Sequence, residues 1–211
     1  MLNKHMSIQV FDKDPREPLG ALVETSLQLQ FTASETKERE LDVLVEELYR
    51  YELGITVKQP VEGKCSFYRV LVAEYEGRVI AGLKVYVAGH SFGEAVPTEL
   101  DGVPIRDYHA KRFGPDSPYC EVCRVVVSKP FRRFDLQRRL IEFVVTYLRE
   151  INCPACYWFA SRAQTQGSHR VVRSLNGKPE VLGVVTVSRG PKPRDLYWSC
   201  VPVRPAPPVS A

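Results

Sequence analysis

A glutamate and an arginine stand three positions apart in the segment Cys120-Glu121-Val122-Cys123-Arg124. A positioned carboxylate can act as a general base, directly or through a water, and remove the proton that an ammonium group must lose before its nitrogen attacks a carbonyl. A nearby guanidinium can orient that carboxylate or bind the carboxylate of a substrate. Glu121 is therefore a candidate base and Arg124 its candidate partner, although a structural ion pair on a strand would have the same residues.

The surrounding residues are β-formers, so this segment is predicted to be a strand. Side chains alternate along a regular strand, which would direct Glu121 and Arg124 to opposite faces. A β-bulge between them would bring both to one cleft, and bulges are common beside active sites.

Basic residues gather directly after this strand. Five of them, Lys129, Arg132, Arg133, Arg138 and Arg139, fall within eleven positions. Such a cluster at the mouth of a cleft would attract an acidic partner. A solvated helix face with charges four positions apart is the structural alternative.

Two cysteine pairs, Cys120-x-x-Cys123 and Cys153-x-x-Cys156, have the form of a four-thiolate zinc site. Zinc knuckles need tight turns, but the first pair lies inside a predicted strand, where its side chains would face opposite ways. The second pair straddles Pro154 at the start of another strand. We therefore expect small buried thiols and no metal, with a zinc-stabilised module as the alternative.

The compartment follows from what the sequence lacks. Residues 1–11 contain no apolar core of a secretory signal, and no stretch approaches 18 apolar residues. We expect a cytoplasmic protein with reduced cysteines and no membrane span. A net charge of +4 is too small to favour nucleic acid as a partner.

The domain that must position these residues is predicted to span 26–203. Residues 1–25 contain two prolines and a glycine near their end and form an N-terminal extension, and 204–211 form a Pro-rich tail. The hydrophobic periods predict strands at 26–32, 67–75, 78–87, 119–128, 155–160, 181–188 and 196–203, and helices after 32, at 133–151 and at 163–175.

Details of the pattern support this order. A capping box from Thr32 to Glu35 opens the first helix and Gly54 is a plausible stop, while Glu76-Gly77 forms a hairpin turn. Residues 88–118 are predicted to be a long loop. A strand, a long helix and a short buried strand imply a parallel crossover, so the fold class is α/β, a mixed sheet with helices on both faces.

This order resembles the GNAT fold of N-acetyltransferases. Residues 71–82 resemble the hairpin that those enzymes carry between their second and third strands, and 125–133 resemble the run into their cofactor-binding helix. The resemblance covers roughly residues 26–200. It implies that a backbone N–H of Val126 or Val127 stabilises the oxyanion. It also implies that two strands splay apart around the donor.

One departure from the GNAT pattern is informative. Acyl-CoA enzymes of this fold carry Arg/Gln-x-x-Gly-x-Gly/Ala, whose glycines let backbone N–H groups approach the pyrophosphate. Here the run is Arg132-Arg133-Phe134-Asp135-Leu136-Gln137. Side chains fill that space and Asp135 would repel a diphosphate. A donor with a single phosphodiester, such as phosphopantetheine on acyl carrier protein, would suffer less, so we expect that donor as a substrate and no permanently bound cofactor.

The segment from Glu121 to Arg124 resembles the Glu-x-Ser-Arg of acyl-homoserine-lactone synthases and of long-chain N-acyl amino acid synthases. Arg50-Tyr51-Glu52-Leu53 resembles their Arg-Tyr-x-Val/Phe segment, which implies that Arg50 helps to bind the acceptor. The lactone synthases usually place a Trp soon afterwards, whereas this chain has only Trp158 and Trp198. The resemblance therefore favours the N-acyl amino acid synthases, including N-acyltyrosine synthases.

An acyl chain would need an apolar tunnel, for which Val125, Val127, Tyr157 and Phe159 on the two splaying strands are candidates, with ordinary core as the alternative. The expected function is transfer of a medium or long acyl group from acyl carrier protein to the α-amine of an amino acid, with tyrosine as the suggested acceptor. A lactone synthase, a CoA-dependent N-acyltransferase and a non-enzymatic GNAT-like binding module remain alternatives.

Overall fold

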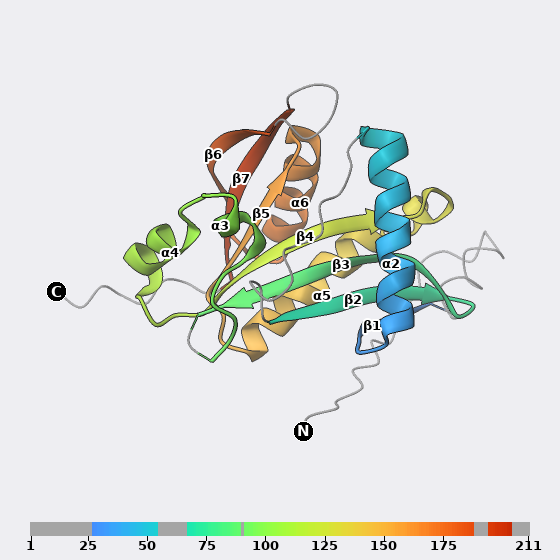
Figure 1. Ribbon diagram of the computed structural model, residues 1–211, viewed down its shortest axis with the longest axis horizontal. Coiled ribbons are helices and arrows are strands. Elements are labelled where there is room, and N and C mark those ends of the chain that lie inside the picture. Colours follow the sequence, from blue (N-terminus) through green and yellow to red (C-terminus); the bar gives the residue numbers. More distant parts are fainter. Residues whose placement is uncertain (1–26, 55–66, 90, 188–193, 204–211) are drawn as a thin grey trace.

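A computed structural model describes residues 27–54, 67–89, 91–187 and 194–203 (Figure 1). The predicted extension 1–25 and the tail 204–211 lie outside these residues. None of the described helices is long and apolar enough to cross a membrane.

Seven strands form one mixed sheet in the order β1-β2-β3-β4-β5-β7-β6. Neighbouring strands are antiparallel except β4 and β5, which are parallel as the crossover argument predicted. The strands are β1 (Gln28–Thr32), β2 (Tyr68–Tyr75), β3 (Arg78–Ala88), β4 (Tyr119–Val127), β5 (Ala155–Ala160), β6 (Glu180–Val187) and β7 (Arg194–Pro202). The β2–β3 turn is made by Glu76 and Gly77, both with positive φ, as a tight hairpin requires.

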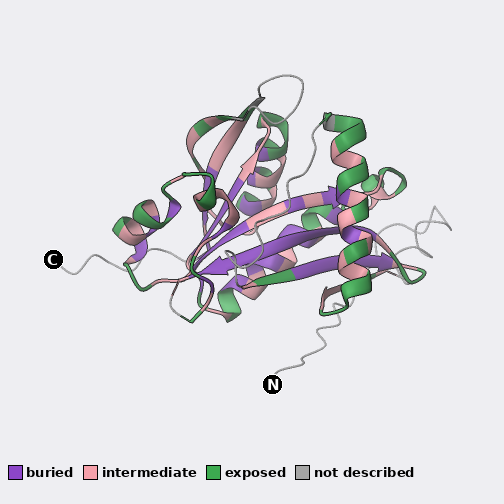
Figure 2. Ribbon diagram, in the orientation of Figure 1, coloured by how far each residue is buried: buried purple, intermediate pink, exposed green. Residues whose placement is uncertain are grey.

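Helices cover both faces of the sheet, which confirms the predicted fold class (Figure 1). Alternation along β3 identifies the faces. One face carries α2 (Glu35–Leu48), α3 (Pro97–Leu100) and α4 (Ile105–Phe113), because Lys84 contacts α2 while Tyr86 and Ala88 pack in the cluster of α4. The other face carries α5 (Leu136–Glu150) and α6 (Arg162–Ser174), which pack with Leu83 and Val85. Covered on both sides, β3 is almost entirely buried (Figure 2).

The prediction that 88–118 is a loop was wrong, because this segment contains α3 and α4. Ile105, His109 and Phe113, four residues apart, bury one face of α4. Arg112 on α4 also forms two hydrogen bonds with Glu180 on β6, of 2.6 and 2.7 Å. The glycines and prolines around these short helices favoured a loop prediction, although the buried residues of α4 have helical spacing in the sequence.

Helix ends differ slightly from the predicted ones. The N-cap of α2 is Ser34, which accepts a hydrogen bond from the amide of Lys37, whereas Thr32 accepts one from the amide of Ser34 at 3.0 Å. The helix then continues as a π-helix, η1 (Tyr49–Leu53), and ends at Gly54 with φ of 62°. A 3₁₀-helix, η2 (Lys129–Phe134), precedes α5.

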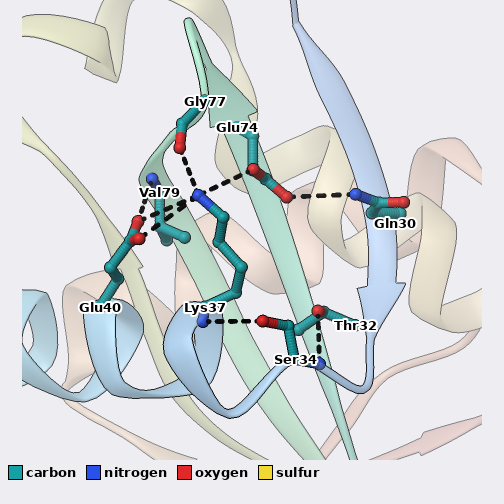
Figure 3. A network of polar contacts seen from close by, with 8 residues as sticks. All are labelled: Gln30, Thr32, Ser34, Lys37, Glu40, Glu74, Gly77 and Val79. Carbon is teal, nitrogen blue, oxygen red and sulfur yellow. Dashed lines mark hydrogen bonds and ion pairs between the residues drawn. The ribbon is translucent and has the colours of Figure 1, made fainter.

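A polar network fixes the N-terminal end of α2 on the hairpin (Figure 3). Lys37 Nζ lies 3.1 Å from a carboxylate oxygen of Glu74 and also donates to Glu40 and to the carbonyl of Gly77. Glu40 accepts the amide of Val79 at 3.0 Å. The first turns of α2 are thereby tied to both strands of the hairpin, which sets the path of the helix across the sheet.

The approach of α2 to the sheet depends on a glycine. A Cβ on Gly82 would lie 2.6 Å from the carbonyl oxygen of Leu71 and 2.8 Å from Cδ1 of Leu41.

We predict that Gly82→Ala lowers the free energy of unfolding by about 1–3 kcal/mol, because the helix or strand must shift. Urea denaturation measures the change.

The matched control is Gly167→Ala in α6, where an added Cβ would meet nothing within 4 Å. That variant is expected to gain about 0.5–1 kcal/mol from helix propensity. Equal effects of the two substitutions would contradict the close approach at Gly82.

Candidate active site

The strand β4 contains a β-bulge. Gly82 pairs with Val126, but Lys84 pairs with Cys123, so Leu83 stands opposite both Arg124 and Val125. Arg124 has φ of 58°, the left-handed conformation that one class of β-bulge contains. The bulge on which the placement of Glu121 and Arg124 depended is therefore present.

The bulge brings Glu121 and Arg124 to the same face of the sheet. Glu121 accepts the amide of Thr98 in α3 at 2.8 Å, and Nη1 of Arg124 lies 3.1 Å from Oδ1 of Asp42 in α2. Beyond the bulge, Val125 points to the opposite face, among the residues that pack with α5. The one extra residue thus keeps Arg124 on the face of α2, while Val125 packs on the face of α5.

A cavity of about 450 Å³ lies where β4 and β5 separate. The two strands pair only at Cys120–Cys156 and Glu121–Tyr157, and beyond these pairs they diverge. Apolar residues of the sheet and α5 form most of the walls: Leu83, Val122, Val125, Val126, Val127, Ile141, Val144, Val145, Leu148, Trp158, Phe159 and Val201. Polar side chains also contribute to the lining, namely Tyr49, Glu52, Arg132, Asp135, Gln137, Gln164 and Ser168.

Hydrogen bonding along β4 distinguishes the two amides that were predicted to stabilise an oxyanion. The amide of Ser128 donates to the carbonyl of Ile80 in β3 at 2.8 Å. Peptide groups alternate in direction along an antiparallel strand, so the amide of Val126 also faces β3 and that of Val127 faces away from it, toward the cavity. Consistent with this direction, the carbonyl of Val127 accepts a hydrogen bond from Nε of Arg132 at 3.2 Å.

Glu121 is 3% exposed and is not among the residues that line the cavity. Besides the amide of Thr98, its carboxylate accepts the Thr98 hydroxyl and, at 3.1 Å, the thiol of Cys123. Burial raises the pKa of Glu121, and these hydrogen bonds partly oppose that rise. A raised pKa makes the carboxylate a stronger base, as general base catalysis near neutral pH requires.

The other predicted site residues fall into two groups. Val125, Val126, Val127, Phe159 and Arg132 line the cavity. Among the predicted residues outside its lining, Tyr157 packs in the same cluster as Phe159, with its hydroxyl 3.0 Å from Nδ1 of His109 in α4. Arg50 is largely exposed and pairs with Glu46 one turn earlier. The other predicted site residues that do not line the cavity are Arg124, Lys129, Arg133, Arg138 and Arg139.

Acidic and aromatic side chains contact the predicted basic cluster. Arg132 binds both carboxylate oxygens of Glu52, at 2.6 and 2.8 Å, and Lys129 lies 3.6 Å from the same group. Arg138 bonds to Glu142 at 2.7 Å. The guanidinium carbon of Arg133 lies 4.9 Å from the ring centre of Phe134, and Arg139 follows on the first turn of α5.

Tyr49 is a cavity residue that sequence reasoning missed. It is the first residue of η1 and packs in the same cluster as Val126, next to the bulge. Burial raises the pKa of Tyr49 to about 12, so the hydroxyl is neutral and can donate a hydrogen bond. A periodic signal was present, because Tyr49 continues the helical spacing of Leu41 and Val45 and packs with them.

The four cysteines do not form one site, because Cys120, Cys153 and Cys156 lie together and Cys123 lies apart from them. Cys120 packs on the α5 face and Cys123 on the α4 face, as strand alternation predicts. Burial and the neighbouring Cys153 and Cys156 raise the pKa of Cys120, which keeps the thiol protonated. Among the described residues, no group of three or more histidine, cysteine or acidic side chains is arranged to hold a metal ion.

Comparison with known proteins identifies a family. The family model described as "Acetyltransferase (GNAT) family" matches residues 33–177. No curated protein sequence matches the chain.

Solved structures share the fold at low identity. FeeM, an N-acyl amino acid synthase from uncultured soil microbes, is 12% identical with a TM-score of 0.54 over 84% of this chain and 91% of its own. An agmatine N-acetyltransferase mutant is 14% identical with a TM-score of 0.58, covering 83% and 98%. A putative N-acetyltransferase from Lactobacillus plantarum is 12% identical with a TM-score of 0.56, covering 85% and 99%.

The placement of Tyr157 against His109 generates a prediction for acid stability. Burial lowers the pKa of His109 from 6.5 to about 4, so the unfolded chain binds a proton before the folded one does. The stability that this neutral histidine contributes is complete above pH 6.5 and is lost as the pH falls toward 4, by roughly 1.4 kcal/mol per unit.

We expect His109→Leu to flatten the pH dependence of unfolding in this window, whatever its effect on stability at pH 7. Urea denaturation at several pH values gives the slope. Tyr157→Phe is the control, since it removes the hydrogen bond but retains the burial, and its slope should stay as steep as that of the wild type. An unchanged slope in the His109 variant would contradict the assignment.

Proposed function

The chain belongs to the GNAT family of acetyltransferases, and on that premise we propose that it transfers a medium- or long-chain acyl group from acyl carrier protein to the α-amine of an amino acid. The observation that carries this proposal is the apolar cavity between the diverging strands and α5. Its volume of about 450 Å³ corresponds to about fifteen water molecules, far more than an acetyl group needs.

The apolar lining of this cavity favours a long acyl chain. Val144, Val145 and Leu148 of α5 form one wall, and Trp158 and Val201 of β5 and β7 lie across from them. Each buried methylene group contributes about 0.8 kcal/mol, so a long chain gains binding energy that a short one cannot. The fold of FeeM, an N-acyl amino acid synthase, is similar to this one.

The geometry at the start of α5 favours a donor with one phosphodiester. Asp135 occupies the N-cap with φ of 56°, the left-handed conformation that glycine adopts most easily. Its side chain is among those that line the cavity. A carboxylate there repels a diphosphate more than a single phosphodiester, and the acidic surface of a carrier protein would meet Arg133, Arg138 and Arg139.

In the proposed reaction the free amine attacks the thioester carbon, and a bond to nitrogen forms while the carbonyl oxygen becomes an oxyanion. The amide of Val127 donates to that oxyanion. Collapse of the intermediate breaks the carbon–sulfur bond, and the proton that the attacking nitrogen loses as the amide forms passes to the departing sulfur, which leaves as the carrier thiol. Glu121, which does not line the cavity, takes the proton that the ammonium group loses through a bridging water, and Arg124, on the same face of the sheet, binds the acceptor's carboxylate. Tyrosine is our suggested acceptor.

A CoA-dependent N-acyltransferase is the second candidate, favoured by the family assignment and by the similar agmatine N-acetyltransferase fold. An acyl-homoserine-lactone synthase and a non-enzymatic binding module remain possible outcomes of the test.

Lipid extraction from bacteria that express this chain, followed by mass spectrometry, tests the proposal. We predict a series of fatty-acylated amino acids spaced by two carbons, and its loss in the Glu121→Gln variant because the base is removed. Acyl-homoserine lactones would move the assignment to the rival synthase. Soluble protein without any new lipid would contradict the proposed synthase.

Filling the cavity should shorten the acyl chains that the enzyme accepts. Val144→Phe places a ring in the wall of α5, and each methylene group that no longer fits should lower kcat/KM for long donors by about fourfold. Val43→Phe on the exposed side of α2, where the valine is 52% accessible, is the matched control. Kinetics with a series of acyl donors measure the preference, and a parallel loss for short and long donors would count against an acyl chamber.

A further inference from the structure

Glu52 is the acidic partner of the basic residues at the start of η2. Its two carboxylate oxygens accept Nη2 of Arg132 at 2.6 and 2.8 Å, and Nζ of Lys129 lies 3.6 Å away. Arg132 in turn donates through Nε to the carbonyl of Val127 at 3.2 Å. A chain of contacts thus connects the end of η1 to the strand whose amide faces the cavity.

This cluster lies at the cavity and remains in contact with solvent. Glu52 and Arg132 both line the cavity. The side chains of Glu52, Arg132 and Lys129 are 26%, 46% and 66% exposed. An anionic group of a ligand can therefore reach the two cations without entering the protein core.

The formal charge of the cluster is set by Glu52. Arg132 and Lys129 each carry a positive charge and Glu52 a negative one, which leaves a net charge of +1. The hydrogen bond from Arg132 is the main cause that lowers the pKa of Glu52, so the carboxylate is ionised at neutral pH. The nearby Asp135 has its own cation, since its carboxylate lies 3.5 Å from Nη1 of Arg138.

A net charge of +1 matches one phosphodiester anion and undercompensates a diphosphate. Without Glu52 the same two cations would carry +2, which matches the diphosphate of coenzyme A. Charged residues at a binding site discriminate between ligands by this kind of match or mismatch.

We propose that Glu52 is a specificity-determining residue, which disfavours diphosphate donors by neutralising one of the two cations that meet the donor's phosphate. This inference rests on the proposed acyl transfer from a phosphopantetheine donor at the cavity. Glu52 takes no part in bond formation. Its role is to reduce the net positive charge that the donor's phosphate groups meet.

Direct binding of coenzyme A and of pantetheine, measured by isothermal titration calorimetry, tests this role without any turnover. Glu52→Gln keeps the size of the side chain and removes its charge. We expect the variant to bind coenzyme A at least about fivefold more tightly than the wild type, and pantetheine, which has no phosphate, with unchanged affinity. The gain for coenzyme A should shrink at high salt, because the cluster is exposed.

Glu46→Gln is the matched control. Glu46 also forms an ion pair, with Arg50, near the same end of α2, but it does not line the cavity. This variant should leave both affinities unchanged. A Glu52→Gln variant that alters coenzyme A and pantetheine equally, or alters neither, would overturn the inference.

Kinetics with acyl carrier protein and acyl-CoA separate this inference from the proposed function. We expect the ratio of kcat/KM for acyl-CoA to that for acyl carrier protein to rise in Glu52→Gln and to stay constant in Glu46→Gln. Equal use of both donors by the wild type would contradict the proposed carrier-protein donor. The calorimetric ratio would still decide whether Glu52 discriminates against the phosphate groups of coenzyme A.

Discussion

The arrangement of the cleft depends on one extra residue in β4. Placing Arg124 in the left-handed region costs about 1–2 kcal/mol for a residue that is not glycine. That cost is offset by its contact with Asp42 and by the packing of the valines beyond it. Without the bulge, strand alternation would carry Arg124 to the α5 face and Val125 to the α2 face. Arg124 would then lose its contact with Asp42, and each of the three valines that follow would change face.

Much of the fold follows from local patterns in the sequence. The hairpin turn at Glu76-Gly77, the long amphipathic helix after β4 and the parallel pairing of β4 with β5 were all predicted, because each rests on residues close together in the chain or on the handedness of a crossover. The helix α4 was missed although Ile105, His109 and Phe113 have helical spacing. A helix of nine residues between a proline and a glycine contains too few periodic positions to outweigh the turn signals on either side.

The site was less accessible to sequence reasoning. Tyr157 and Phe159 stand on the same strand with similar chemistry, yet one packs against His109 and the other lines the cavity. Sequence alone does not distinguish the wall of a cavity from an ordinary core, since both need apolar residues. Which amide of β4 faces the cavity, and whether Arg132 is paired, depend on contacts between segments far apart in the chain. Such contacts produce no periodic pattern in the sequence.

Two irregularities meet at the cavity: the bulge in β4 and the π-helix that ends α2. Each amounts to a single additional residue in an otherwise regular element. A deletion of one codon in η1 would restore an α-helix and rotate the residues that follow it by about 100° around the helix axis. Glu52 would then leave Arg132, while the hydrophobic contacts of Leu41 and Val45 earlier in the helix would persist. The chain can therefore acquire or lose features of its cleft through changes in length, a route of divergence that substitution matrices do not record.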